Sequence, residues 1–287
     1  MRRVAGLKDL AGDYDALLCD VWGVLHNGVA ASAPAVEALQ RFRGEVGPVV
    51  LLTNAPRPHG PIREQLRALS VPDDAYDAIV TSGDVTRAVI AEKPGVKVLH
   101  LGADRDLSFY EGLDLTMVGE AEAELISCTG LFDDTVETPE DYRALFERLI
   151  ARGLVMVCAN PDLVVERGDT LIYCAGALAR FYQELGGRAV LVGKPHAPIY
   201  KAAREILAGL GGARLLAIGD GLPTDIRGAC DNGLDVLFVT GGIHAADFGP
   251  TQMPDPERVA ARLSAEGLSA VAFLPSLAWD TGYTEPS

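Results

Sequence analysis

The chain has 287 residues, a length that fits one large domain or two ordinary ones. Hydrophobic residues make up 48% and charged residues 23%, which excludes disordered, collagen-like and coiled-coil classes. Subtracting 40 acidic residues from 25 basic ones leaves a net charge of −15, and such a field repels phosphate backbones and anionic membrane surfaces. We therefore expect no nucleic-acid partner and no membrane partner.

The sequence also predicts the cellular location of the protein. No apolar stretch approaches the roughly 20 residues that span a bilayer. Charged residues among the first 20 positions interrupt any apolar region of a signal peptide. The five cysteines are an odd number without CxxC spacing, which argues against a disulfide framework and a zinc site. We therefore expect a cytoplasmic protein.

Short β-rich runs alternate with amphipathic runs in the first 83 residues. Strands are predicted over 16–21, 48–53 and 78–81, with helices between them over 35–43 and 62–69. This alternation is the βαβ pattern of a parallel sheet. The strands lack a polar and apolar alternation, which is typical of strands buried on both faces.

The same alternation returns near the C-terminus. Strands are predicted over 189–192, 215–218 and 236–239, with helices over 199–210 and 225–232.

A more acidic segment over 84–188 separates these two regions and has strand and helix candidates of its own. We therefore predict an α/β protein. Its doubly wound parallel-sheet core comprises residues 1–83 plus 189–287, and an α+β domain over 84–188 is inserted into it.

Polar residues directly follow four predicted strands. Asp20 ends the apolar run in LLCDVWGVLHNG, and Thr53 and Asn54 end the run in VVLLTNAPRP. Lys194 follows a strand in VLVGKPHAPIY. The last pair of residues, in LLAIGDGLPTDI, is Asp220 and Asp225. Because ligands gather at the carboxyl ends of parallel strands, all these side chains can converge at one edge.

These residue types suit phosphate chemistry. A carboxylate at Asp20 can act as a nucleophile or a metal ligand, and Asp220 and Asp225 can complete an oxygen site for Mg²⁺. Thr53 and Asn54 can donate hydrogen bonds to an oxyanion, and a fixed cation at Lys194 favours a bound anion. Taken singly, each residue also fits a helix cap or a solvated loop. The ordered combination is far more specific.

In these motifs the chain resembles the haloacid dehalogenase superfamily, and particularly its class IIA branch of NagD-like phosphatases. The resemblance covers nearly the whole chain. The matching strings are DVWGVL at 20–25, LLTNAP at 51–56, IVTSGDVTR at 79–87, ANPD at 159–162, GKPHAPIY at 193–200 and IGDGLPTDI at 218–226.

The resemblance implies a hydrolase in which Asp20 attacks phosphorus and forms an aspartyl-phosphate. Mg²⁺ would be held by Asp20, by the backbone carbonyl of Trp22 and by Asp220, with Asp225 as ligand or support. The substrate would be a small phosphate monoester, such as a sugar phosphate or a nucleotide.

The resemblance also implies two further sets of contacts with the substrate. Lys194 would offset the charge of the phosphoryl group, and Thr53 would donate to it with help from Asn54. The segment 84–188 would be a C2-type cap, with Asn160 and Asp162 aimed at the substrate, although an Asx-type turn before Pro161 explains these two equally well. Relatives often form dimers through the cap, so a homodimer is a possible assembly.

One residue departs from the family pattern. Two positions after the nucleophile, phosphatases of this superfamily usually carry a second Asp that acts as general acid and base, and this chain has Trp22. An indole N–H does not give up its proton near neutral pH. His26 could act as the general acid and base in place of the missing Asp, although an ordinary structural role in the loop explains this histidine better.

Three readings of this departure stay open. The chain is a slow phosphatase that favours good leaving groups, a hydrolase that cleaves a different bond, or a phospholigand-binding or regulatory protein without turnover.

Overall fold

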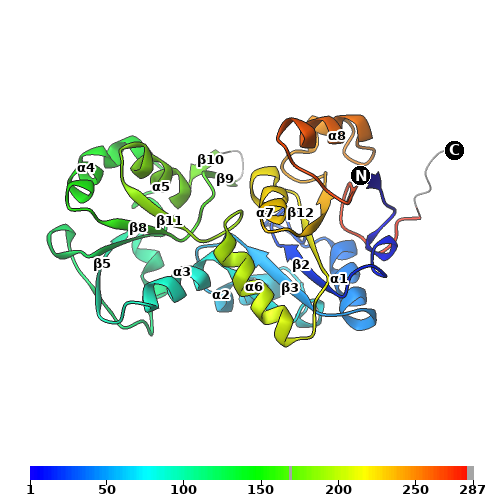
Figure 1. The fold of residues 1–287 in the computed structure, drawn as a ribbon, viewed down its shortest axis with the longest axis horizontal. Coiled ribbons are helices and arrows are strands. Elements are labelled where there is room, and N and C mark those ends of the chain that lie inside the picture. Colours follow the sequence, from blue (N-terminus) through cyan, green and yellow to red (C-terminus); the bar gives the residue numbers. More distant parts are fainter. Residues whose placement is uncertain (168–169, 283–287) are drawn as a thin grey trace. The chain divides into compact units, whose positions relative to one another are not determined.

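The structure, a computed structural model, describes residues 1–167 and 170–282, and its contacts divide the chain into two units (Figure 1). Unit 1 comprises Met1–Thr53, Ile62–Val80 and Tyr200–Ser287. Unit 2 comprises Asn54–Pro61 and Thr81–Ile199. In the described part of the chain, no helix is both long enough and apolar enough to span a membrane.

Unit 1 is built on a seven-stranded sheet with the order β1-β14-β13-β12-β2-β3-β4. Strand β2 pairs in parallel with β12 on one side and with β3 on the other. The chain proceeds outward from β2 through β3 and β4, and later from β12 in the opposite direction, so the order reverses between β2 and β12. The strands are β1 (Arg2–Arg3), β2 (Ala16–Asp20), β3 (Val49–Thr53), β4 (Ala78–Thr81), β12 (Leu215–Gly219), β13 (Asp235–Val239) and β14 (Ala272–Leu274).

The central strands are buried on both faces, as their unbroken apolar sequences predict. Every residue of β2 and β3 is buried. Two of the surrounding helices begin at capping residues: the side chain of Ser32 caps α1, and that of Asp255 caps α8. The helices around this sheet are α1 (Ala33–Glu45), α2 (His59–Ala68), α6 (Ala197–Gly209), α7 (Arg227–Asp231) and α8 (Pro256–Ala265).

Unit 2 has a second parallel sheet with the order β11-β8-β7-β5-β6, together with the antiparallel hairpin β9–β10. The parallel sheet makes this unit more regular than the expected α+β domain, because its antiparallel pairing is confined to the hairpin among the described residues. The elements are α3 (Ser82–Ala91), β5 (Val96–Leu101), β6 (Leu115–Met117), β7 (Leu125–Cys128), α4 (Arg143–Ala151), β8 (Val155–Cys158), β9 (Val164–Arg167), β10 (Thr170–Tyr173), α5 (Ala175–Glu184) and β11 (Arg188–Leu191).

Short helical segments connect these elements in both units. They are the 3₁₀ segments η1 (Leu7–Asp9), η2 (Asp73–Ala75), η3 (Asp104–Tyr110), η4 (Glu120–Glu122), η5 (Pro139–Tyr142) and η7 (Ala245–Phe248), and the π-helical turn η6 (Leu222–Ile226).

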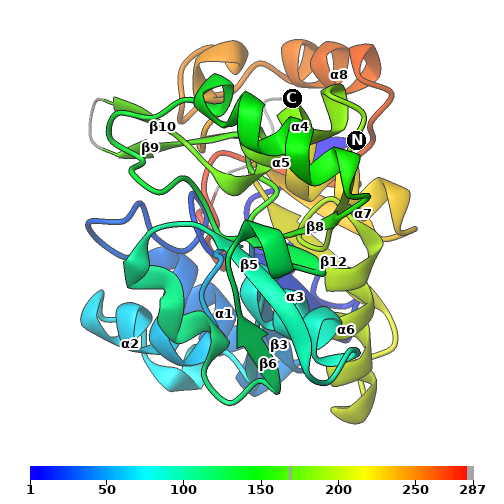
Figure 2. The same cartoon turned by 90° about the vertical axis from the view of Figure 1, so that its left-hand side faces the viewer.

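Alternate residues of β7 and β8 pack on opposite faces of the second sheet. Ile126 and Met156 belong to a cluster that includes Phe146 of α4, whereas Leu125 and Val157 belong to a cluster with α3 and η3. Helices α4 and α5 accordingly lie on one face and α3 on the other (Figures 1 and 2). The unit therefore has a three-layer α/β/α arrangement.

The strand predicted over 189–192 is observed as β11. The sequence assigned it to the core sheet, and this assignment was wrong. Strand β11 pairs with β8 at the edge of the sheet of unit 2. Its residues alternate between exposed and half-buried, because successive side chains of a strand point to opposite faces of the sheet. The other predicted core strands are observed as β2, β3, β4, β12 and β13, within a residue or two of the predicted ends.

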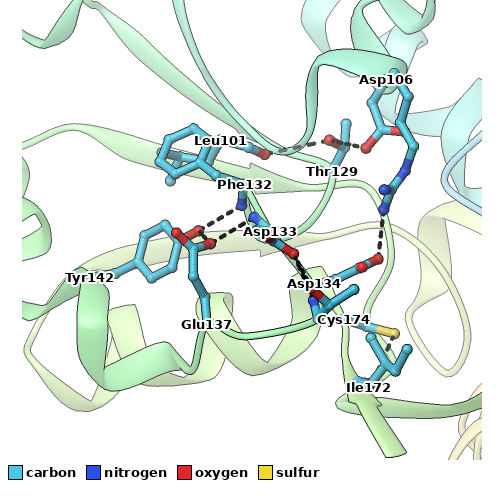
Figure 3. Close-up of polar contacts among 12 residues, drawn as sticks. Leu101, Asp106, Thr129, Phe132, Asp133, Asp134, Glu137, Tyr142, Ile172 and Cys174 are labelled. Atoms are coloured by element: carbon cyan, nitrogen blue, oxygen red, sulfur yellow. Dashed lines mark hydrogen bonds and ion pairs between the residues drawn. The ribbon is translucent and has the colours of Figure 1, made fainter. Parts of the chain in front are cut away.

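A hydroxyl ties together the loops that follow β5 and β7. Thr129 donates to a carboxylate oxygen of Asp106 over 3.0 Å and lies 3.0 Å from Nε2 of His100. Its Oγ1 also lies 3.4 Å from the carbonyl oxygen of Leu101 (Figure 3). Gly102 has φ +156°, and an added Cβ there would lie 1.9 Å from this hydroxyl, so the close approach requires glycine.

The next segment is held by Tyr142. Its hydroxyl donates to Glu137 over 2.7 Å and accepts the N–H of Phe132 over 2.7 Å (Figure 3). The same Glu137 carboxylate accepts the N–H of Asp133. These bonds order the loop at the carboxyl end of β7.

His100 should make unit 2 sensitive to mild acid. Burial lowers its pKa from 6.5 and outweighs the opposing charges of Asp106 and Asp104. As the pH falls below 6.5, the imidazole of His100 therefore binds a proton in the unfolded chain but not in the folded one. The folded state loses stability as the pH falls from 6.5 to the lowered pKa.

We expect His100→Gln to lose less stability than the wild type when the pH drops from about 7.5 to about 5.5, by up to about 1 kcal/mol. Thermal unfolding at both pH values measures this difference. Equal losses in the two proteins would show that His100 contributes nothing to the pH dependence.

Candidate active site

Three carboxylates meet at the point where the strand order of unit 1 reverses. Asp20 is the last residue of β2, Asp220 follows β12, and Asp225 lies in η6. One oxygen atom from each lies within 4.8 Å of the other two, and the residues are only 3–6% exposed. The predicted convergence of these residues is therefore observed in the geometry of a single unit.

Backbone N–H groups hold two of the three carboxylates in place. The N–H of Ile243 donates to Asp220 Oδ2 over 2.9 Å, and the N–H of Gly221 donates to Asp225 Oδ2 over 3.0 Å. The π-helical turn that carries Asp225 is a geometry often found at functional sites.

Two glycines allow the chain to press against Asp220. An added Cβ would lie 2.4 Å from Asp220 Oδ2 at Gly23 and 1.8 Å from it at Gly242. Gly23 also has φ +85°, a region that favours glycine. The carboxylate is therefore clamped between two loops.

This donor set fits a hard divalent cation. Like charges at this separation repel strongly when they are removed from water, and a bound cation would relieve that repulsion. Carboxylate oxygens at a small, rigid site are typical ligands of Mg²⁺, and Mn²⁺ accepts the same ligands. Asp20, Asp220 and Asp225 are therefore the residues of unit 1 that could hold a metal.

The loop after Asp20 folds back on itself. The N–H of Gly23 donates to the carbonyl of His26 over 2.8 Å, and the N–H of Gly28 donates to His26 Nδ1 over 3.0 Å. His26 is buried, and burial lowers its pKa, so the imidazole is neutral near pH 7. These contacts give His26 a structural role in this loop.

Thr53 is the last residue of β3, the strand that pairs with β2 next to Asp20. It is 8% exposed. The threonine and the nucleophile candidate therefore stand at the carboxyl ends of neighbouring strands.

In unit 2, Asn54 joins two segments that are distant in the sequence. Its Oδ1 accepts the N–H of Lys194 over 2.7 Å, and its Nδ2 donates both to the Lys194 carbonyl over 3.0 Å and to Asp162 Oδ1 over 2.8 Å. Both N–H bonds of the amide are thus engaged within the protein. Asn54 holds the backbone of the buried Lys194 and the side chain of Asp162 in place.

Asn160 and Asp162 form an Asx turn around Pro161, one of the two alternatives expected for this string. Asn160 Oδ1 accepts the N–H of Asp162 over 3.0 Å. Gly176 lies against this turn, because an added Cβ there would be 2.2 Å from the Pro161 carbonyl oxygen.

The sequence reasoning missed the loop after β13. It contributes the N–H of Ile243 and the close approach of Gly242 to Asp220. The available signal was the pair Gly241 and Gly242, one residue after a predicted strand, in VLFVTGG.

Comparison with known proteins identifies a family for this arrangement. A model described as haloacid dehalogenase-like hydrolase matches residues 17–116, and a HAD-hydrolase-like model matches residues 191–265. A solved haloacid dehalogenase-like hydrolase from Brucella suis 1330 is 50% identical, covers 96% of this chain and 99% of its own, and has a TM-score of 0.81.

Two curated relatives carry names of phosphatases. Ribonucleotide monophosphatase NagD of Escherichia coli K12 is 26% identical, covering 80% of this chain and 89% of its own length. D-glycerol 3-phosphate phosphatase of Mycobacterium tuberculosis is 27% identical, covering 84% of this chain and 67% of its own. A glycerol phosphate phosphatase from that organism has been solved in complex with magnesium, at 24% identity with a TM-score of 0.64, covering 82% of this chain and 70% of its own.

Gly242→Ala should displace the carboxylate of Asp220, because the new Cβ would overlap Oδ2. We expect affinity for Mg²⁺, measured by isothermal titration calorimetry, to fall at least about tenfold. Gly44→Ala in α1 is the matched control, since an added Cβ there meets nothing within 4 Å. Equal affinity in the two variants would refute the role of Asp220.

Asn54→Ala should leave the buried N–H of Lys194 without its acceptor. We expect the free energy of unfolding in urea to fall by about 1–3 kcal/mol. Gln40→Ala, which removes an exposed hydrogen bond to Asp74, should cost about 0.5 kcal/mol or less. If Asn54→Ala lowers the free energy of unfolding no more than this control does, Asn54 does not hold Lys194 in place.

Proposed function

Because the chain belongs to the haloacid dehalogenase-like hydrolases, in their NagD-like class IIA branch, we propose that it hydrolyses a small phosphate monoester at Asp20 with the help of Mg²⁺. Its reaction class is that of a phosphatase acting on phosphorylated small molecules. The observation that carries the proposal is the buried group of Asp20, Asp220 and Asp225 at the strand-order reversal.

The proposed reaction splits one displacement into two. A carboxylate oxygen of Asp20 attacks phosphorus in line, the bond from phosphorus to the leaving oxygen breaks, and an aspartyl-phosphate forms. Water then attacks that phosphorus and releases inorganic phosphate. A bound Mg²⁺ would neutralise charge so that a carboxylate can approach an anion.

The metal would be held by Asp20, Asp220 and the backbone carbonyl of Trp22, with Asp225 as ligand or support. The structure supports this assignment through the mutual distances of the three carboxylates. Magnesium in the solved mycobacterial phosphatase supports the choice of cation.

Thr53 and Lys194 would stabilise the phosphoryl group. Thr53 would donate its hydroxyl to a non-bridging oxygen, and Lys194 would offset negative charge. We assign Asn54 to positioning rather than to direct contact, because both N–H bonds of its amide are engaged by Lys194 and Asp162.

The inserted domain, predicted over 84–188 and extended by β11 in the structure, would act as the cap and contact the substrate through Asn160 and Asp162. A sugar phosphate or a nucleotide is the substrate class we propose, and the phosphatase names of the relatives support it. A homodimer and a cytoplasmic location stay predictions.

A protein that binds phosphorylated ligands without turnover is the second candidate, and cleavage of a different bond is the third. Trp22 favours both, because the usual acid and base is missing at that position.

Asp20→Asn should abolish phosphate release, because an amide is not a nucleophile toward phosphorus. The measurement is release of phosphate from 4-nitrophenyl phosphate and from sugar and nucleotide phosphates, with Mg²⁺ or with EDTA. We expect release by the wild type with Mg²⁺, and a fall to background both with EDTA and in Asp20→Asn.

The same variant controls for contaminating phosphatases. Thermal stabilisation by phosphorylated compounds, together with equal inactivity of wild type and Asp20→Asn, would favour the binding protein. Equal activity of the two proteins would refute the role of Asp20.

A further inference from the structure

Trp22 is exposed in a site whose charged groups are buried. Its side chain is 47% exposed, whereas Asp20, two residues earlier, is 6% exposed and Asp220 is 3% exposed. An exposed aromatic ring two residues from Asp20 in the chain is available for contact with a ligand.

The indole ring is held rigidly by its own loop. An added Cβ at Gly28 would lie 2.3 Å from Trp22 Cη2, so the ring rests directly on the glycine backbone. The His26 ring meets it edge to face, with centroids 5.2 Å apart and planes at 78°. The bond from the N–H of Gly23 to the carbonyl of His26 closes the loop. The ring is therefore preorganised, with much of its surface still accessible.

Two further exposed residues near these carboxylates in the chain are apolar, and Asn27 in the same loop is exposed and polar. Val29, directly after Gly28, is 84% exposed. Ile243 is 63% exposed, and its N–H donates to Asp220.

The same position cannot supply a proton. Trp22 offers an indole N–H that does not ionise near neutral pH. His26 is the one titratable side chain in the sequence from Val21 to Ala30, and its Nδ1 is engaged by Gly28 while its ring is 5% exposed. Neither Trp22 nor His26 can therefore protonate the leaving oxygen when the phosphorus–oxygen bond breaks.

We propose that Trp22 is a specificity-determining residue that selects phosphate esters with a planar leaving group able to depart as a stable anion, as in aryl and enol phosphates. The inference rests on the phosphatase activity proposed above. The indole face stacks on the planar group, and delocalisation in that group stabilises the charge that no acid neutralises.

The step balances without an acid. Asp20 forms a bond to phosphorus, the bond to the leaving oxygen breaks, and its electron pair stays on that oxygen as a phenolate or enolate. The anion takes a proton from solvent after it departs. Water then opens the aspartyl-phosphate and passes its proton to solvent.

The first test compares leaving groups in the wild-type enzyme. The value of kcat/KM is measured for 4-nitrophenyl phosphate, phenyl phosphate and glycerol phosphate with Mg²⁺. Because kcat/KM includes the departure of the first product, it should fall steeply along this series, by about 10²-fold or more from the first compound to the last.

The second test separates stacking from the missing acid. Trp22→Leu removes the aromatic face, and Trp22→Phe keeps one. We expect Trp22→Leu to raise KM for 4-nitrophenyl phosphate about tenfold more than KM for acetyl phosphate, whose small leaving group has no ring to cover the indole. Trp22→Phe should recover most of the loss. Thermal unfolding of each variant checks that the fold is intact.

Each outcome decides a different claim. Equal kcat/KM for glycerol phosphate and 4-nitrophenyl phosphate would overturn the inference and leave the phosphatase proposal standing. An unchanged KM in Trp22→Leu would overturn the stacking role. If the wild type releases phosphate from none of the compounds, the proposed function fails and the inference fails with it.

Discussion

Mutual repulsion among Asp20, Asp220 and Asp225 is the constraint around which unit 1 is arranged. The three residues come from two neighbouring strands and a π-helical turn, and all are withdrawn from solvent. Backbone N–H groups and glycine-lined loops hold them within 4.8 Å of one another. Holding three carboxylates together in this way costs free energy without a cation. The arrangement therefore favours binding of a divalent metal at the reversal of strand order.

In unit 2, a buried lysine and a polar loop follow two neighbouring strands of one sheet. Lys194 follows β11 and Asp162 follows β8, and these strands are neighbours in the same sheet. Asn54 ties the two segments together with three hydrogen bonds. Asn54 thereby fixes the backbone of Lys194 and the side chain of Asp162 relative to each other.

Features that depend on the local sequence pattern could be predicted from the sequence. Features that depend on contacts between distant residues could not. Asp20, Thr53 and Asp220 stand at strand ends because apolar runs stop there, and this can be read directly from the chain. The partner of β11 could not be read in this way, because an apolar run of four residues fits either sheet. The bridging role of Asn54 and the approach of Gly242 to Asp220 likewise join residues far apart in sequence, so no local pattern encodes them.

The central claim is that Asp20 forms a covalent phosphoryl intermediate. Mass spectrometry of peptides from enzyme that is quenched in acid during turnover of 4-nitrophenyl phosphate tests it directly. The account predicts a phosphoryl group on the peptide that contains Asp20, lost when the quenched protein is treated with hydroxylamine. Trapping is favoured here, because the residue that usually activates water is replaced by Trp22. Turnover with unmodified Asp20, or with the phosphoryl group on another residue, would contradict the account.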